Sequence, residues 1–346
     1  MAISFSGTKL PQSELAIIQK EIYADWGTFR NQDVSIEEGH KADAEVYESK
    51  VTVTMAAYSS SAITAGSDSL AVQRTPVTLT KIQFKDVIDY NTLLNTRFEK
   101  SMKAGAFNLV SSEFDNAVLQ DISPAISQTM ENVTWDGATT AQKVLIAALT
   151  PGAPQGSISA GAQTLAAAMP VNLVNSFPAT ILHNSSQSKV APGAGLGDYK
   201  KVLTIAAITS SSIAAEYAKL YAVINPTVLA ETSLDVKIFA PLAHRQLIMV
   251  ANNAVGAAQQ VNFLVVGAGL DAKIYYNGIE ILFKPLVGFM IACPKNYLKI
   301  LMDLTSDVSS LETGTMANGA EQMYYANVQS FATWCTNQRY IVLYGG

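Results

Sequence analysis

Charge is scarce in this sequence. Asp, Glu, Lys and Arg together make up 15% of the 346 residues, whereas about 25% is typical of a globular domain. Hydrophobic residues reach 49%, and the mean hydropathy is +0.19. Because a dispersed monomer needs charge over its surface, we expect much of the surface of this chain to be covered by other chains.

Cysteine, histidine and long apolar runs are also scarce. Two cysteines, Cys293 and Cys335, are too few for a disulfide framework, which fits a reducing compartment. The three histidines, His40, His183 and His244, lie far apart in the sequence and disfavour a histidine-based metal site. No apolar run approaches the roughly eighteen residues needed to span a bilayer, and the N-terminus lacks the basic head and apolar core of a cleaved signal peptide.

Basic clusters are missing as well. The net charge is −5, and no stripe of lysine or arginine stands out. A protein that grips nucleic acid directly carries such a stripe. We therefore expect no direct nucleic-acid binding, although a wall that only surrounds nucleic acid is compatible with this charge.

One string matches a cofactor motif. Gly267, Gly269 and Ala272 spell G-x-G-x-x-A directly after the apolar run FLVV. In dinucleotide-binding proteins a helix follows these glycines, and its N-terminus holds the pyrophosphate. Here Asn277-Gly278, a strong signal for a type I′ hairpin turn, follows instead between β-forming residues. We therefore predict a bend between strands, and a nicotinamide or flavin oxidoreductase is the alternative interpretation.

The other candidate groups carry little specific chemistry. His244 has no identifiable triad partner, and Cys293 lies in an apolar stretch typical of a buried thiol. Asp303 and Asp307 are typical of turn or helix caps, and the glycine cluster at 192–198 has no preceding strand. One polar segment has the donor types of a cation site without a specific spacing: Glu37, Glu38, His40, Asp43 and Glu45. We predict no catalytic, cofactor-binding or metal-binding residue and no enzyme activity.

The apolar pattern predicts an α+β chain. Helical spacing indicates helices at residues 14–23, 90–102, 112–133, 139–149, 210–224 and 241–254. Pro124 is expected to bend or break the third of these. Alternation or β-forming composition indicates strands at 48–58, 76–87, 178–183, 234–240, 320–334 and 339–345.

The first two of these strands read as one long hairpin with a Ser- and Gly-rich tip. In the second strand the alternation changes phase after Lys81, which suggests a β-bulge or a twist. A two-stranded hairpin is marginal in water. It therefore needs a neighbour to lie on, and another subunit is one such neighbour.

The order of these elements resembles the major capsid proteins of tailed bacteriophages, whose HK-ninety-seven fold is shared with encapsulins and the herpesvirus capsid floor. The passage 274–304 carries the most similar residues: Tyr276, Gly278, Asn296, Leu298 and Asp303. The closing FATWCTNQRYIVLYG resembles the terminal strands of that family. The resemblance implies six regions: an N-terminal arm (1–45), an E-loop hairpin (46–89), a peripheral or P-domain with a spine helix (90–150), a variable loop-rich segment (151–199), an axial or A-domain (200–320) and closing P-domain strands (321–346).

The resemblance also implies a function. It indicates a structural protein that assembles with itself into hexamers and pentamers of an icosahedral phage head around double-stranded DNA. Portal and scaffolding proteins, and in some cases decoration proteins, are the implied partners, with no membrane. The implied location is the virion, after assembly in the bacterial cytoplasm, and an encapsulin-type shell is the alternative. Some family members crosslink their subunits through lysine, but nothing near Lys81 or Lys85 identifies such a bond.

Overall fold

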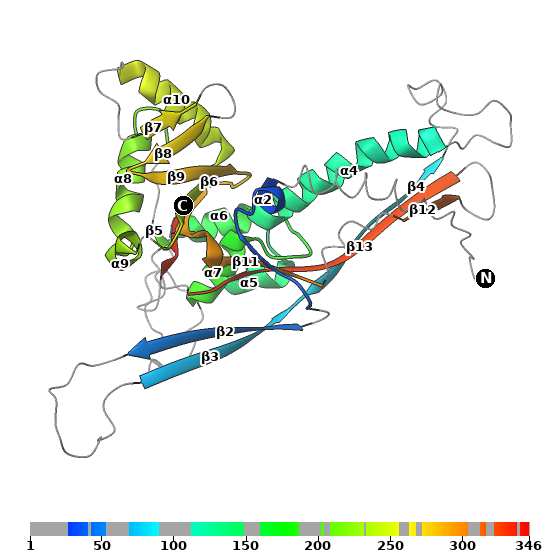
Figure 1. The fold of residues 1–346 in the computed structure, drawn as a ribbon, viewed down its shortest axis with the longest axis horizontal. Helices are drawn as coiled ribbons and strands as arrows, with labels where there is room; N and C mark the ends of the chain where they lie inside the picture. The colour runs from blue at the N-terminus through cyan, green and yellow to red at the C-terminus, as the bar shows by residue number, and fades with distance from the viewer. Residues whose placement is uncertain are drawn as a thin grey trace, which may run out of the picture. The chain divides into compact units, whose positions relative to one another are not determined.

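The structure is a computed structural model whose described residues fall into two compact units (Figure 1). The first unit comprises Met1–Ala42, Leu79–Val133 and Ile300–Ala332, and the second comprises Asp43–Thr78, Thr134–Lys299 and Thr333–Gly346. The structure describes residues 27–40, 43–52, 69–89, 112–148, 160–186, 202–203, 208–231, 233–255, 263–267, 272–303, 312–315, 322–337 and 340–345. The helices predicted at 14–23 and 90–102 lie outside these residues.

A five-stranded sheet and one long helix form the first unit. The strands β1 (Ser35–Glu37), β11 (Leu298–Met302), β13 (Gln322–Cys335) and β12 (Glu312–Thr315) follow one another in the sheet, and β4 (Thr80–Asp89) also pairs with β13. The β4–β13 ladder is antiparallel over ten residue pairs, from Gln322↔Asp89 to Phe331↔Thr80. The short helix α2 (Gly27–Arg30) bonds to the long helix through Thr28, whose hydroxyl donates to Glu131 at 2.7 Å.

The long helix α4 (Ser112–Trp135) confirms the helix predicted at 112–133, and of the bend or break expected at Pro124 the break is wrong. A proline removes one N–H donor and crowds one carbonyl. Pro124 is exposed, whereas Ile126 and Met130 on the same helix are buried. Burial of that face stabilises the helix on the C-terminal side of the proline, so the helix continues through it.

The contact between α4 and the sheet is partly polar. Ser123 and Ser127 of α4 are buried, and so are Asn327 and Gln329 of β13. The amide of Gln329 donates to the sulfur of Met130 at 3.3 Å, while the side-chain oxygens of Gln329 and Ser123 have no hydrogen-bond partner among the residues that the structure describes. Hydroxyls and amides thus occupy positions that aliphatic side chains usually fill.

A seven-stranded sheet forms the core of the second unit. Its order is β5 (Val202–Leu203), β14 (Val342–Gly345), β10 (Phe289–Pro294), β6 (Val236–Pro241), β9 (Ile279–Lys284), β8 (Lys273–Tyr276) and β7 (Phe263–Val266). Two pairs are parallel, β6 with β9 and β14 with β5. The other pairs are antiparallel. The last strand of the chain, β14, lies between β5 and β10.

The helices α8 (Ile213–Val223), α9 (Pro226–Ala230) and α10 (Leu242–Val255) belong to the same unit. α8 and α10 cover one face of this sheet (Figure 1). Tyr217 of α8 is fully buried there, with Phe263 and Tyr276 at ring-centroid distances of 5.2 and 5.6 Å. On the other face Trp135 stacks on Phe239 at 4.9 Å. The predicted helices at 210–224 and 241–254 and the strand at 234–240 are confirmed.

Three further helices lie between α4 and β5. The predicted helix at 139–149 is confirmed as α5 (Thr140–Ala147), which is capped by the side chain of Thr139. The predicted strand at 178–183 is wrong, because these residues belong to α7 (Phe177–Ser186). Another helix, α6 (Ala160–Ala168), crosses the stretch expected to be mostly loop. Alanine favours helix more than any other residue, and proline is favoured in the first turn, where Pro178 lies.

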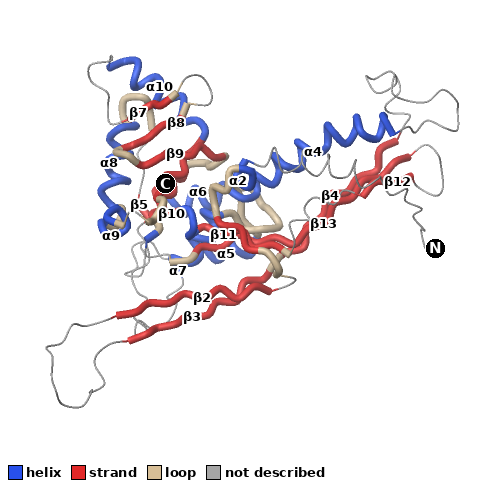
Figure 2. Tube along the Cα trace, in the orientation of Figure 1, coloured by secondary structure: helices blue, strands red, loops and turns tan. Residues whose placement is uncertain are grey.

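The hairpin β2–β3 is confirmed with different bounds (Figure 2). β2 (Asp43–Thr52) pairs with β3 (Ser69–Thr78) over ten residue pairs. The predicted second strand is divided, because β3 ends at Thr78 and β4, which begins at Thr80, pairs with β13 instead. Val77 and Leu79 are buried before this junction and Ile82 after it. The phase change in the sequence therefore marks a change of strand partner.

Candidate functional site

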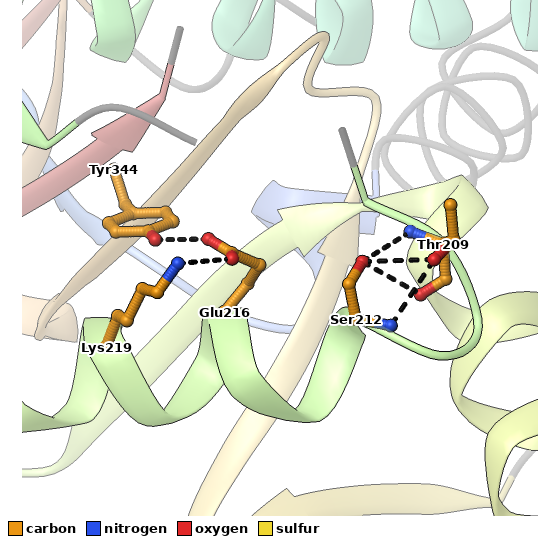
Figure 3. Close-up of polar contacts among 5 residues, drawn as sticks. All are labelled: Thr209, Ser212, Glu216, Lys219 and Tyr344. Carbon is orange, nitrogen blue, oxygen red and sulfur yellow. Dashed lines mark hydrogen bonds and ion pairs between the residues drawn. The ribbon is translucent and has the colours of Figure 1, made fainter. Parts of the chain in front are cut away.

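A buried carboxylate joins the last strand of the chain to α8 (Figure 3). Glu216 is 2% exposed, and its two oxygens accept hydrogen bonds from the hydroxyl of Tyr344 and the ammonium of Lys219, the latter at 2.6 Å. Burial alone raises the pKa of Glu216, but the hydrogen bonds from Lys219 and Tyr344 and the charge of Lys219 outweigh it and lower that pKa. Burial and the bond to Glu216 raise the pKa of Tyr344. This carboxylate stays charged and holds β14 against α8.

Two hydroxyl residues brace the start of the same helix (Figure 3). The backbone N–H of Thr209 donates to the Oγ of Ser212 at 2.9 Å, and the N–H of Ser212 donates to the Oγ1 of Thr209 at 3.3 Å. These reciprocal bonds close the turn that leads into α8, and they do not cap the first N–H groups of the helix itself. Neither hydroxyl contacts a general base among the residues that the structure describes, so the pair fixes the helix start without forming a nucleophile site.

An ion-pair network links three strands of the seven-stranded sheet, β6, β9 and β8, with Asp235 before β6 and Lys295 after β10. Lys237 of β6 bonds to Glu280 of β9 at 2.6 Å and to Asp235 at 2.9 Å. Lys273 of β8 and Lys295 extend the network to Glu280 and Asp235, at 3.1 and 3.3 Å. Burial opposes charge on Glu280, but the hydrogen bonds and charges of Lys237 and Lys273 lower its pKa. Because each acid is paired with lysine, the network stabilises the sheet and leaves no acid to act as a base.

His244 lies in the aromatic core. It is 7% exposed at the start of α10, and its Nδ1 is 3.3 Å from the hydroxyl of Tyr217. Burial lowers the pKa of His244 to about 4. At neutral pH the ring is therefore uncharged, and the structure describes no serine or cysteine bonded to it. The sequence left open whether His244 is a packed or a surface histidine, and the structure shows the packed one.

The G-x-G-x-x-A string lies between two strands, as predicted. Gly267 follows β7 with a φ of 101°, and β8, antiparallel to β7, begins one residue after Ala272. Asn277 and Gly278 have φ values of 47° and 84° and connect β8 to β9, as a type I′ turn requires. Gly269 lies outside the described residues. The nicotinamide or flavin interpretation loses its support, because a strand stands where the motif needs a helix N-terminus.

The other candidates are scattered. Asp303 directly follows β11, and its carbonyl accepts a backbone hydrogen bond from Gly39 at 2.6 Å. Cys293 is buried in β10, and burial raises the pKa of its thiol. Within the described ranges no three His, Cys, Asp or Glu residues gather as metal ligands, the segment with Glu37, Glu38, His40, Asp43 and Glu45 included. Asp307, residues 192–198 and the side chain of His183 lie outside the description.

No helix among the described residues has both the length and the apolar character needed to cross a membrane. The residues quoted for the family resemblance lie on consecutive elements: Tyr276 and Gly278 in the β8–β9 hairpin, Asn296 in the 3-10 turn η4 (Lys295–Tyr297), Leu298 in β11 and Asp303 directly after it. They form no shared pocket or polar cluster. What the sequence left unseen was the Glu216–Tyr344 bond, whose members are 128 residues apart. Its one local signal was a glutamate on the apolar face of a predicted helix.

Exposed apolar side chains are the other notable surface feature of the second unit. Leu264 and Val266 on the edge strand β7 are 52% and 50% exposed. β7 carries neither proline nor charge, the usual protections of a sheet edge. α10 exposes Leu242, Met249 and Val250 on one side. Such surfaces are typical of proteins that contact other chains.

Comparison with known proteins gives a result at the level of structure. No protein-family model matches the chain, and no curated protein does. Among solved structures, the capsid of Myoviridae phage XM1 matches with a TM-score of 0.51 and 9% identity, over 92% of this chain and 91% of that chain. The mature capsid of bacteriophage PhiM1 matches with a TM-score of 0.49 and 9% identity, over 100% and 90% of the two chains. The encapsulin of Synechococcus elongatus PCC 7942 matches with a TM-score of 0.47 and 10% identity, over 99% and 92%.

At 9% identity the likeness to the phage XM1 capsid, whose TM-score is 0.51, establishes the fold and not the activity. The phage XM1 capsid, with the highest TM-score of the three, covers both compact units of the chain. The order of hairpin, long helix, seven-stranded sheet and closing strands agrees with the order predicted from the sequence. The chain has the α+β HK-ninety-seven fold of phage capsid proteins.

Proposed function

We propose that this chain is a major capsid protein, which assembles into hexamers and pentamers of an icosahedral phage head around double-stranded DNA. One observation carries the proposal: the fold matches the phage XM1 capsid over 92% of the chain with a TM-score of 0.51. The role is structural, with no catalytic step. Its place is the virion, after assembly in the cytoplasm of the bacterial host.

The surface of the chain supports an assembled state. Charged residues are 15% of the sequence, and edge strand β7 presents Leu264 and Val266 to solvent. The hairpin β2–β3 is a sheet of its own in the topology, and two strands alone are marginal in water. Contacts between copies would cover these features.

The partners follow from the role. The first partner is the chain itself, and portal and scaffolding proteins are expected to join it, with decoration proteins in some particles. The six regions from the N-terminal arm at 1–45 to the closing strands at 321–346 remain our proposed division. The two closing strands, β13 and β14, lie in different sheets. DNA would be enclosed without a sequence-specific site, because a chain of net charge −5 binds phosphate weakly.

The contents of the particles test this proposal. We would purify particles on a density gradient from bacteria that express the chain alone and from bacteria that produce the phage encoding it, treat them with nuclease and examine them by electron microscopy. Particles from phage-producing cells that protect double-stranded DNA and carry one portal vertex are the expected result. Particles that contain a protein cargo would establish an encapsulin-type shell instead. Saturable binding of a nicotinamide or flavin cofactor that is lost in Gly269→Val would support the oxidoreductase.

A further inference from the structure

The turn between β8 and β9 combines a chemically reactive pair of residues with an exposed position. Asn277 and Gly278 are both exposed, whereas Tyr276 and Ile279 on either side of them are buried. An asparagine followed by glycine is prone to lose its side-chain ammonia, because glycine has no Cβ to shield its backbone nitrogen. Among the described residues no atom lies within 4 Å of the place where a Cβ on Gly278 would stand. This side of Gly278 is therefore open to solvent.

The reaction consumes water and releases ammonia, with no other reactant. The backbone nitrogen of Gly278 attacks Cγ of Asn277, a new C–N bond forms, and the side-chain nitrogen leaves as ammonia. The product is a cyclic succinimide, which water then opens. Opening at the Cγ side gives aspartate. Opening at the main-chain carbonyl gives isoaspartate, in which the backbone runs through the former side chain.

The folded turn opposes this attack. Asn277 and Gly278 have φ values of 47° and 84°, and in a type I′ turn the first central residue has a ψ of about +30°. This conformation directs the nitrogen of Gly278 away from the Asn277 side chain, so the turn must open before the ring can close. Its two ends are held by buried residues, since Tyr276 pairs with Ile279 and lies 5.1 Å from Phe263 between ring centroids.

The two products have different consequences for the turn. Aspartate retains the turn, because Asp-Gly also forms type I′. Isoaspartate inserts one extra methylene into the backbone between the Cα of residue 277 and Gly278. A two-residue turn closed by the pair of Tyr276 and Ile279 cannot hold a longer connection without moving that pair. The isoaspartate form therefore disturbs the aromatic core that Tyr276 helps to build.

We propose that Asn277 is a site of spontaneous deamidation, gated by opening of the β8–β9 turn, and that its isoaspartate product loosens this end of the seven-stranded sheet. Two observations carry the inference: the reactive pair is exposed, and the residues that hold its turn closed are buried. The turn slows the reaction without abolishing it, so the amount of product records how often the turn opens. The inference is independent of the proposed shell function, because it concerns the chemistry of one turn within one chain.

Peptide mapping by mass spectrometry tests the gating. Folded protein and protein unfolded in urea would be incubated side by side in mildly alkaline buffer. Peptides that contain residue 277 would be quantified over time, and isoaspartate would be identified by enzymatic methylation.

Two variants separate opening of the turn from general loss of stability. Ile279→Ala weakens the buried pair that closes the turn. Leu343→Ala removes an equally large buried side chain from β14, which β10 and β6 separate from β9. Circular dichroism would confirm folding, and Ile279→Val with Ile291→Val is the milder pair if an alanine variant does not fold.

The expected rates follow from the gating. The folded chain should deamidate at Asn277 at least about tenfold more slowly than the unfolded chain, because the turn must open first. In the folded protein Ile279→Ala should raise the rate by about tenfold, since it removes a buried aliphatic side chain from the closing pair. Leu343→Ala should stay within about threefold of the unmodified chain, because the turn itself is unchanged.

The consequence for stability has its own control. Asn277→Asp supplies the aspartate product from the start and carries the same charge as isoaspartate. In aged protein the fraction with isoaspartate should unfold at a lower urea concentration than Asn277→Asp. Equal unfolding midpoints would contradict the proposed loosening of the sheet.

Three results would overturn the gating. Equal rates in the folded and unfolded chain would show that the turn does not protect Asn277. An equal rise in Ile279→Ala and Leu343→Ala would assign the reaction to global unfolding. No product in the folded protein, Ile279→Ala included, by the time the unfolded chain is fully converted would show that the turn does not open. Each of these results leaves the shell function intact.

Discussion

The seven-stranded sheet buries aromatic rings beneath α8 and α10, whereas the five-stranded sheet buries hydroxyls and amides beneath α4. Tyr217, Phe263 and Tyr276 contact one another in the first core. Within the described part of the chain, Ser123 and Gln329 in the second each keep an oxygen without a hydrogen-bond partner. A buried polar group without a partner destabilises the fold by about 1–3 kcal/mol. The difference indicates that the sheet-helix contact at α4 is held less firmly than the aromatic core.

Removing a central ring should disrupt the aromatic core most. Tyr217→Ala is expected to lower the free energy of unfolding by about 3–5 kcal/mol, because a buried ring leaves a cavity that cannot fully collapse. Chemical denaturation followed by tryptophan fluorescence, to which Trp135, fully buried in the same unit, contributes, would measure the loss. Tyr221→Ala is the control, since Tyr221 is only partly buried. Equal losses in the two variants would contradict the central place of Tyr217.

Acid should weaken the same core through His244. Burial lowers the pKa of His244 to about 4, so the unfolded chain binds the proton more strongly. The contribution of His244 to the free energy of unfolding should be complete above about pH 6.5, the pKa of histidine in the unfolded chain. It should fall by about 3 kcal/mol as the pH drops to 4.

His244→Gln keeps a polar group near Tyr217 but does not titrate, so it is the matched control for this pH dependence. The difference in unfolding free energy between the unmodified chain and this variant, measured from pH 7 to pH 4, should shrink as the pH falls. A difference that stays constant over this range would show that His244 is not buried in its neutral form.

The Glu216–Tyr344 bond should contribute as a pair. Glu216→Leu leaves the buried hydroxyl of Tyr344 without its acceptor, and we expect a loss of about 1–3 kcal/mol. Tyr344→Phe in addition removes that stranded hydroxyl, so the double variant should lose less than the sum of the two single losses. Thermal unfolding of all four proteins in the cycle would measure the coupling, and simple additivity would mean that the two side chains do not interact.

Removing the Ser123 hydroxyl from the polar contact at α4 should keep or raise stability, whereas the substitutions in the aromatic core and at Glu216 lower it. Ser123→Ala removes a buried hydroxyl that has no partner among the described residues, so we expect unchanged or slightly increased stability, by up to about 1 kcal/mol. Ser127→Ala is the matched control, because its hydroxyl donates to the carbonyl of Ser123 at 3.0 Å, and it should be mildly destabilising. Denaturation midpoints that fall equally in both would mean that Ser123 has a partner in solution.

Local signals in the sequence predicted most elements. Asn277-Gly278 indicates its turn because both positions need positive φ, and the apolar repeat from Ile122 to Met130 indicates α4 because a packed helix must bury one face. The strand at 178–183 was wrong because Thr180 and Ile181 favour strands, while the helix-start signal of Pro178 was given too little weight.

The sequence did not predict which distant strands pair with each other. The phase change after Lys81 was visible, but its cause is that β4 pairs with β13, about 240 residues further along the chain. Alternation shows which side chains share a face and does not name the partner strand. The bond between Glu216 and Tyr344 was hidden for the same reason, since β14 must first lie beside β10 before Tyr344 faces α8.

The most direct test of the account is the mass of the purified protein in solution. Sedimentation velocity over a range of protein and salt concentrations should show slow monomers or capsomers together with a fast component of very many copies, which electron microscopy resolves as closed icosahedral shells. A single species near 36.9 kDa under every condition, with scaffolding protein also supplied, would contradict the account.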